Sequence, residues 1–475
     1  MEDTYTLWQK QKGFLDSEKI KYPDLFQRAP LINTQEVLKL VGITALPTEQ
    51  PLVYLRLWPQ DFIVEEISRD GSVHTVDYAA DQVVSDSEGL TVYADLVKIG
   101  ISTLDAADEL AKVLATEKKN IGYAGIKDRD AITSQFLSFR NISAKVISAV
   151  SAPNFFLKNI YQGKGAIQVG DLQGNKFTLV LRGTEPFATD ALKSKLRDYE
   201  KNGFWNFYYT QRFGTPRLIA HLLGLLVLER KYEDVLKTFL TFQSPSEIGY
   251  FSDIRKSVLE HWNNWPKIIS ILEPLSFSFR RELSMFDFLI KHPGDFLGAL
   301  KLYPEHIQIW VMAYTSYLFN CKLSMLIKKD RVPEQLPIVL STNRSHWEFY
   351  RDLLSADSLA FPAHIFRDLP WIQLKERMIN TRQKFEFLNF VVNPDKPQIG
   401  VIGFSLPKGS YATTLLSHFF TLSFNVPIPA GIDPEVVDSK KILGTGSVTP
   451  VSELFKDVIH SKLEVKEEMS DEAAA

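Results

Sequence analysis

The residues best suited to chemistry in this sequence lie between positions 122 and 135. Lys127, Asp128 and Arg129 place one carboxylate between two cations, in a segment whose glycines permit tight backbone geometry. Flanking positive charge favours the ionised form of a carboxylate, which a nucleophile must be. The triplet therefore makes Asp128 a candidate catalytic carboxylate.

Two other interpretations of the same residues stay open. Asp128 or Asp130 could cap a helix that continues through Ala131 and Gln135, because Asp is a favoured N-cap residue. The two carboxylates could also bind Mg²⁺, although no further acidic cluster supports such a site.

Two other stretches combine aromatic and polar residues. Residues 203–217 carry six aromatics beside Arg212 and Arg217, a combination that can stack bases and hold phosphates. A buried strand that runs into a loop would explain the aromatics equally well. Residues 174–182 alone predict a turn entering a strand, with Phe177 in the core.

The composition excludes several classes of protein. The chain has 475 residues, 45% hydrophobic and 23% charged, as in an ordinary globular protein. Its single cysteine, Cys321, excludes intrachain disulfides and thiolate zinc sites, and the nine histidines show no metal-binding spacing. The start of the chain lacks a signal-peptide pattern, and residues 218–228, the most apolar stretch, are too few to cross a bilayer. We therefore expect a cytoplasmic protein with no membrane partner.

The charge is distributed unevenly. The formal net charge is −3, which argues against a general nucleic-acid coating protein. Residues 118–182, however, contain ten Lys and Arg against three Asp, a local charge of +7. The segment could be an ordinary solvated surface or a surface that meets phosphates.

Segments with strand patterns surround a mainly helical block. Alternating apolar residues predict strands within 51–67, 92–99, 176–182, 387–392 and 399–404. Helical spacing appears in 103–116, 218–240, 253–262, 274–291 and 305–329. The order of these elements predicts an α+β fold in which one domain is inserted into another.

Six stretches, in this order, resemble the TruD-type pseudouridine synthase family: residues 59–66, 124–135, 174–182, 206–214, 313–320 and 404–413. The resemblance implies a curved mixed sheet with helices and an inserted, mainly helical α/β domain. It places the catalytic domain in residues 51–217 and 385–430 and the inserted domain in 218–384. Residues 1–50 would be an extension without a match, and 431–475 a partly disordered tail.

The resemblance also assigns roles to residues. Asp128 would act on the target uridine, Phe177 would stack on its base, and Asn175 would assist from the same turn. Arg56 would pair with Asp128 at a position where the family is expected to have lysine. Candidates for phosphate contacts are Lys127, Arg212 and Arg217. The sequence departs from the family at Ser417 and His418, where an Arg-Glu pair is usual.

The activity implied by the resemblance is isomerisation of uridine to pseudouridine, in which uracil leaves C1′ of the ribose, turns over and rejoins through C5. Such a reaction needs no metal or cofactor. The implied substrate is structured RNA, with position 13 in the D-arm of tRNA the family's usual site, and we expect a monomer. One alternative is a non-catalytic RNA-binding or RNA-folding protein that uses the same cleft. Another is a glycoside hydrolase, which would require a second positioned carboxylate.

Overall fold

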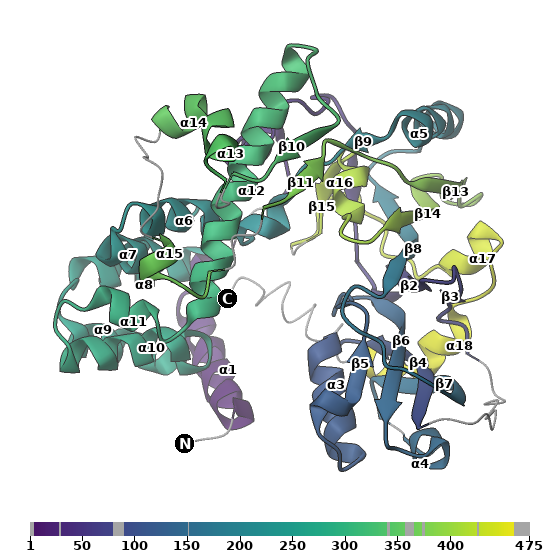
Figure 1. Ribbon diagram of the computed structural model, residues 1–475, viewed down its shortest axis with the longest axis horizontal. Coiled ribbons are helices and arrows are strands. Elements are labelled where there is room, and N and C mark those ends of the chain that lie inside the picture. The colour runs from purple at the N-terminus through teal and green to yellow at the C-terminus, as the bar shows by residue number, and fades with distance from the viewer. Residues whose placement is uncertain are drawn as a thin grey trace. The chain divides into compact units, whose positions relative to one another are not determined.

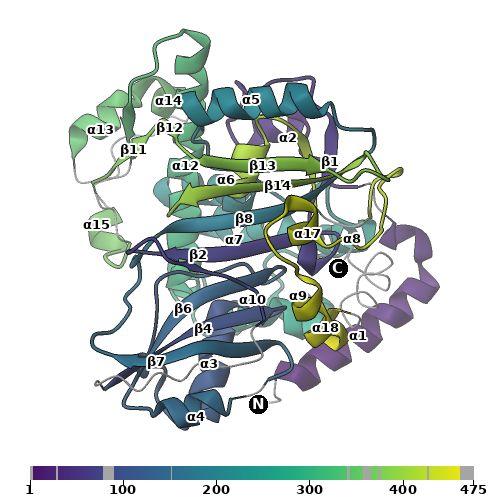
Figure 2. The same ribbon diagram turned by 90° about the vertical axis from the view of Figure 1, so that its right-hand side faces the viewer.

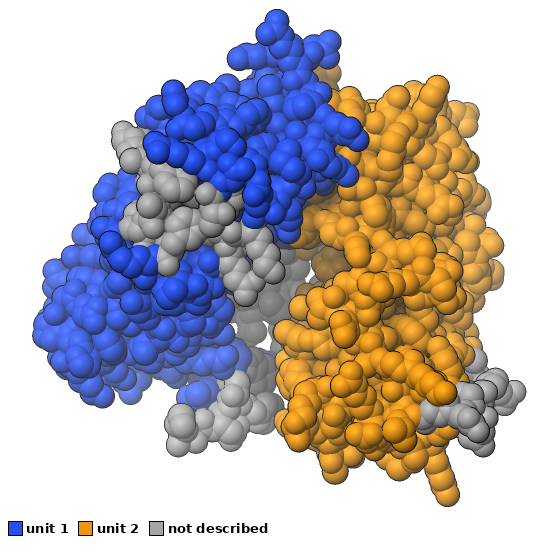
Figure 3. Space-filling view, viewed as in Figure 1, with its two compact units in different colours: residues 1–48, 206–381, 469–475 blue, residues 49–205, 382–468 orange. Residues whose placement is uncertain are grey.

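The computed structural model describes residues 4–27, 30–78, 90–150, 152–339, 343–356, 365–372, 376–424 and 427–459 (Figure 1). The chain divides into two compact units (Figure 3). Within the described residues, the first is drawn from 1–48 and 206–381, and the second from 49–205 and 382–468. The N-terminal residues thus group with the helical block, where we expected a separate extension. The helical block itself begins at 206 instead of 218.

A mixed sheet forms the second unit (Figure 2). Its main path in the described residues runs β13-β14-β8-β2-β6-β4-β7, with β1, β3, β5 and β15 attached at the sides. The strands are β1 (Leu52–Tyr54), β2 (Phe62–Ser68), β3 (Val73–His74), β4 (Thr91–Ile99), β5 (Ile121–Tyr123), β6 (Ile132–Arg140), β7 (Phe155–Gly163), β8 (Leu172–Gly183), β13 (Glu386–Val392), β14 (Ile399–Pro407) and β15 (Thr421–Ser423). β2 pairs with β6 and β1 with β15 in parallel, and the other described pairings in this sheet are antiparallel. Two short strands, β9 (Phe204–Trp205) and β12 (Arg382–Gln383), pair where the chain leaves and re-enters this unit.

Helices cover both faces of the sheet. α3 (Thr103–Val113) and α4 (Ala144–Ser148) bury one face of β4, β6 and β7, with Leu96, Leu110 and Phe139 in a shared core. α17 (Ser439–Leu443) and α18 (Thr449–Leu454) cover the opposite face. The unit is completed by α5 (Thr189–Asn202) and α16 (Ala412–Leu416). Residues 431–459 are therefore part of the folded unit, contrary to the expected tail, and 460–475 lie outside the described residues.

A buried ion pair joins the sheet to the segment before α17. Arg182 on β8 is fully buried and donates to both carboxylate oxygens of Asp61, each at 2.8 Å. Its remaining nitrogen donates to the main-chain oxygens of Asp433 and Glu435 at 2.7 and 2.8 Å. A buried guanidinium needs such partners, because an unpaired charge in the interior is costly.

The segment after Asp128 is a strand. The helix that Asp128 or Asp130 would have capped is absent, because Ile132–Arg140 form β6, paired with β2 and β4. β-branched Ile132 and Thr133 suit this extended conformation. The helix-cap interpretation of Asp128 is therefore wrong.

The first unit is mainly helical, and α12 is its longest described helix (Figure 1). Its helices are α1 (Thr4–Lys21), α2 (Gln35–Leu40), α6 (Ala220–Leu228), α7 (Tyr232–Thr241), α8 (Gly249–Glu260), α9 (Trp265–Leu272), α10 (Ser276–Lys291), α11 (Phe296–Leu300), α12 (Pro304–Lys328), α13 (Arg344–Phe349), α14 (Arg351–Ala356) and α15 (Ile365–Asp368). A short hairpin pairs β10 (Gln335–Pro337) with β11 (Met378–Asn380). No helix within the described residues is long and apolar enough to cross a membrane.

Candidate active site

Arg56 and Asp128 form an ion pair in the sheet unit. Arg56 Nη2 lies 3.1 Å from Asp128 Oδ1, and the side chains are 21% and 42% exposed. Arg56 follows β1 with a φ of 62°, in the left-handed region that non-glycine residues rarely adopt. Asp128 lies in the loop between β5 and β6. The structure thus presents a carboxylate that is both paired with a cation and open to solvent.

Three stacked or edge-packed phenylalanines support this pair from neighbouring strands. The Arg56 guanidinium lies 3.8 Å from the centre of the Phe62 ring, a cation–π geometry. Phe62 meets Phe177 edge-on at 6.2 Å, and Phe177 stacks on Phe404 at 5.3 Å. Phe177 is opposite Val64 on β2 and Phe404 on β14, so these side chains share one face of the sheet. Phe177 as a whole residue is only 5% exposed.

Asn175 lies on the same face of β8, two residues before Phe177. It is opposite Glu66 on β2 and Leu406 on β14. Its side-chain oxygen is buried and has no hydrogen-bond partner among the described residues. The preceding Gly174 allows β14 to approach, because a Cβ there would collide with the carbonyl oxygen of Leu406. An acceptor without a partner is a group that a ligand could satisfy.

Lys127 is placed differently from its neighbour. Its side chain is buried, and its ammonium pairs with the buried carboxylate of Glu66 on β2. The main-chain N–H of Lys127 donates to the Thr103 hydroxyl at 2.9 Å, and that hydroxyl donates to Gln135 at 2.8 Å. The expected phosphate contact of Lys127 does not fit this burial, because a phosphate would have to displace Glu66 from an enclosed pair. Lys127 instead ties the Asp128 loop to β2.

Arg212 and Arg217 belong to the helical unit. Arg212 is half-buried, with its guanidinium carbon 5.4 Å from the centre of the Tyr208 ring. Arg217 donates to the main-chain oxygen of Phe239 at 2.7 Å, and burial lowers the pKa of its guanidinium to about 10. The two arginines thus have partners within their own unit, and contact with phosphate stays a prediction for both.

Ser417 and His418, which replace the pair usual in the resembling family, are buried. The Ser417 hydroxyl donates to Thr414 O at 2.8 Å. His418 Nδ1 donates to the same oxygen at 2.8 Å, and its Nε2 accepts from the N–H of Trp205 at 3.1 Å. Burial lowers the pKa of this imidazole to about 4, so it is neutral near pH 7. These residues therefore hold α16 against the end of β9.

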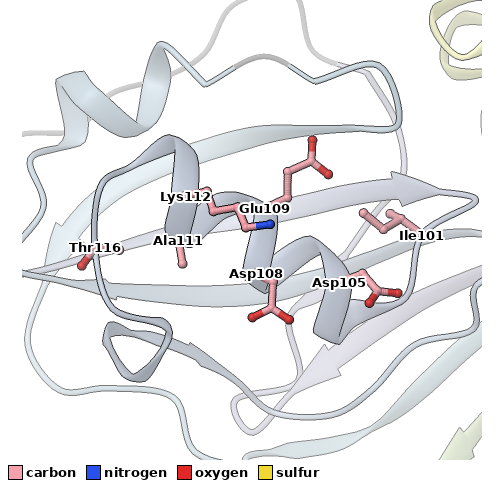
Figure 4. Close-up of a pocket in the computed structure, with 7 residues that line it drawn as sticks. All are labelled: Ile101, Asp105, Asp108, Glu109, Ala111, Lys112 and Thr116. Carbon is pink, nitrogen blue, oxygen red and sulfur yellow. The ribbon is translucent and has the colours of Figure 1, made fainter. Parts of the chain in front are cut away.

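A hollow beside α3 has a lining unsuited to RNA phosphates (Figure 4). Its lining includes three carboxylates and one ammonium: Asp105, Asp108, Glu109 and Lys112. No candidate site residue lines it. Within the described residues, no group of three or more His, Cys, Asp or Glu side chains is arranged to hold a metal ion.

Phe62 and Glu66 are site residues that the sequence analysis did not single out. Both lie on β2, on the face that β8 shares through Phe177 and Asn175. The alternation within residues 62–66 could have indicated them, since strand residues two apart point to the same face.

Comparison with known proteins agrees with this architecture. The family model "tRNA pseudouridine synthase D (TruD)" matches residues 42–343, more than half of the chain. "Probable tRNA pseudouridine synthase D" of Methanopyrus kandleri is 28% identical over 341 residues, covering 68% of this chain and 83% of that protein. The protein of the same name in Methanococcus aeolicus is 30% identical over 401 residues, covering 77% and 95%.

A solved structure shows the same fold. The Methanosarcina mazei crystal structure titled "Putative tRNA pseudouridine synthase D (TruD)" superposes with a TM-score of 0.64 at 21% identity. The match covers 82% of this chain and 98% of that one. This chain therefore shares its α+β fold with that solved structure. Together with the family match, this shows that the chain belongs to the TruD family of tRNA pseudouridine synthases, which are isomerases.

Proposed function

We propose that this protein converts uridine 13 in the D-arm of tRNA to pseudouridine, with Asp128 as the catalytic carboxylate. The observation that carries the proposal is the solvent-open carboxylate of Asp128, paired with Arg56 beside an aromatic face, in a chain of this family. We further propose that the protein acts in the cytoplasm, as a monomer.

The proposed chemistry begins with extrusion of the target nucleotide. A uridine inside folded RNA must leave its stack, which costs on the order of a few kcal/mol. The base would then lie beside Phe177 and Asn175, and its N3–H could donate to the unpartnered Asn175 oxygen. Phe177 is only 5% exposed as a residue, so stacking on it requires its ring to become more exposed.

Asp128 would act once the base is held. Its carboxylate is exposed, so it can approach the ribose or the base of an extruded nucleotide. Arg56 would fix the carboxylate by a charge-assisted hydrogen bond. The N1–C1′ glycosidic bond breaks, uracil turns over, and C5 joins C1′. The proton on C5 is then released and N1 takes one up from solvent, so that the product is an isomer of uridine and no oxidant is needed.

The test is direct detection of pseudouridine in defined RNA. The purified protein is incubated with a tRNA transcript that has uridine at position 13 and with a matched transcript that has cytidine there. Pseudouridine at position 13 of the first transcript alone is the expected result. Pseudouridine elsewhere would refute the proposed position, and RNA binding without any pseudouridine would favour a non-catalytic RNA-folding protein.

A further inference from the structure

Lys98 on β4 is a fully buried cation directly beneath the Asp128 loop. Its side chain is 0% exposed. The ammonium donates to the main-chain oxygens of Asp128 at 2.8 Å, Ile101 at 2.9 Å and Lys127 at 3.4 Å. A lysine ammonium has three N–H donors, so these carbonyls give each donor a place.

The cost of burying the Lys98 ammonium explains why the three carbonyls must stay in place. Removing an ammonium from water is costly unless it is well hydrogen-bonded, so Lys98 stays buried only while the three carbonyls remain in position. Two of them belong to consecutive residues of the loop that carries Asp128. The third, Ile101 O, belongs to the segment that leads from β4 into α3. The Lys98 ammonium thus connects the Asp128 loop to β4 and to the start of α3.

Neighbouring contacts reinforce the same loop. Gly100 donates its N–H to Arg129 O at 3.0 Å, and the Arg129 side chain donates to Gly100 O at 3.3 Å. The Thr103 hydroxyl holds the N–H of Lys127, and Gln135 holds Gly125 O. The backbone on both sides of Asp128 is therefore fixed from beneath, while the carboxylate faces solvent beside Arg56.

We propose that Lys98 is a positioning residue for the pseudouridine synthase reaction, acting through the main chain of Asp128. It holds the loop at the place where the Asp128 carboxylate meets both Arg56 and the substrate. Because Lys98 is enclosed, it does not contact RNA, and its loss should slow the chemical step without weakening tRNA binding. This inference rests on the proposed catalytic role of Asp128.

Lys98→Met tests the inference, because methionine keeps an unbranched chain of similar length and removes the ammonium. A shift of the loop by about 1 Å should lower the single-turnover rate of pseudouridine formation in a tRNA transcript roughly 100-fold. The dissociation constant of the same transcript should stay within about threefold of wild type, because no phosphate contact is lost. A rate close to wild type, or an equal loss of rate and affinity, would overturn the proposal.

Lys158→Met is the matched control. Lys158 is also buried and donates to a main-chain oxygen, that of Asp77 at 2.7 Å, but it lies on β7 away from the Asp128 loop. The same chemical change there should leave the rate nearly unaltered. A comparable loss of rate in both variants would show that Lys98 contributes only to general stability and would overturn the proposal.

Hydrogen exchange gives a readout that does not depend on activity. In Lys98→Met, deuterium uptake should rise in peptides covering residues 100–103 and 124–131, while peptides from β6 and β8 keep their wild-type protection. Unchanged uptake in the loop would overturn the positioning role even if the wild-type protein formed no pseudouridine. Absence of pseudouridine from the wild type would instead refute the proposed function.

If Lys98→Met does not fold, Thr103→Val tests whether contacts from beneath position the Asp128 loop. It removes the hydroxyl that holds Lys127 N–H without burying or removing a charge. A roughly tenfold slower single-turnover rate with unchanged tRNA affinity would support positioning of the loop from beneath. A wild-type rate would contradict it.

Discussion

Lys127 and Asp128 are neighbours in the chain with opposite surroundings. The Lys127 ammonium is enclosed with Glu66, while the Asp128 carboxylate is open to solvent beside Arg56. One side chain anchors the loop to the sheet, and the other remains available for substrate.

Phe177 offers a residue-scale test of base stacking. Phe177→Leu keeps an apolar side chain against Phe62 and Phe404, so the free energy of unfolding should fall by less than about 1.5 kcal/mol. Loss of an aromatic platform removes about 1–3 kcal/mol of base binding, so catalytic efficiency should fall roughly tenfold or more.

Phe404→Leu is the control for this substitution, since Phe404 stacks on the far side of Phe177 and is fully buried. Urea unfolding and turnover are measured for both variants. Equal small losses of activity in the two would mean that Phe177 contributes only to the core.

The site residues differ in how far sequence could predict them. The Arg56–Asp128 pair was expected from the family resemblance, and the structure places the two side chains together. The burial of Lys127 could not be predicted, because its partner Glu66 is remote in sequence and a loop has no periodicity that assigns a face. Lys98 lies on the same face of β4 as Leu96 and Ala94, so alternation predicts that it is buried. Alternation does not predict which main-chain carbonyls its ammonium contacts.

The strands that carry the site were largely predictable, and their pairing was not. Alternation within residues 62–66 and 176–182 predicts β2 and β8, and both form. β6 was open to a helical interpretation because Asp128 and Asp130 resemble N-cap residues. Pairing with β2 and β4 decided the outcome, and such pairing joins residues that are far apart in sequence.

α17 and α18 provide an element-scale test. Val448, Val451 and Phe455 pack on Ile63 and neighbouring residues of the sheet. A chain that ends after residue 430 should fail to unfold cooperatively, because this face would be exposed to water.

A chain that ends after residue 459 is the control for this truncation and should keep the wild-type melting temperature. Circular dichroism during heating distinguishes the two. Cooperative melting of the shorter chain at the wild-type temperature would show that the C-terminal helices do not stabilise the sheet.

His418 makes the junction of α16 and β9 sensitive to acid. Its folded-state pKa of about 4 is lower than its ordinary value, mainly because of burial. The unfolded chain therefore binds a proton first as pH falls, and the stability contributed by neutral His418 is present above pH 6.5 and lost towards pH 4. The loss should amount to about 3 kcal/mol.

His418→Gln isolates this contribution. The variant should be less stable than wild type at pH 7, and the difference in unfolding free energy should shrink as pH falls from 6.5 to 4. Urea unfolding at several pH values measures the difference. A constant difference would contradict burial of a neutral imidazole.

For the whole molecule, the net charge of −3 conceals an uneven distribution. Three of the ten cations in residues 118–182 are buried with partners in the protein: Lys127, Lys158 and Arg182. At most seven remain for RNA. A count of charges in the sequence could not separate these seven from the three buried cations.

The place of the N-terminal residues was equally unpredictable. They join the helical unit through contacts between residues remote in sequence, such as Gln11 with Ser278 and Thr44 with Ser324.

The affinity for tRNA should fall with salt. If residues 118–182 contact phosphates, a plot of the logarithm of the tRNA association constant against the logarithm of the salt concentration should have a negative slope. The seven available cations limit the contribution of these residues to that slope to about 6 in magnitude. Arg129→Gln, next to Asp128, should reduce the slope by about 1. Lys112→Gln is the control, because Lys112 lies beside the carboxylates of α3, and it should leave the slope unchanged. Filter binding at several salt concentrations measures both, and a flat wild-type slope would remove this segment from the RNA interface.

The most direct test of the whole account is Asp128→Asn. The substitution preserves shape and removes the charge, so pseudouridine formation in a tRNA transcript should be abolished while tRNA affinity and the unfolding transition stay close to wild type. Asp108→Asn is the matched control, because Asp108 is also exposed and paired with a cation, Lys118 at 2.7 Å, outside the site. Asp108→Asn should form pseudouridine at about the wild-type rate. If Asp128→Asn also formed pseudouridine at a rate near that of wild type or of Asp108→Asn, catalysis by Asp128 would be contradicted.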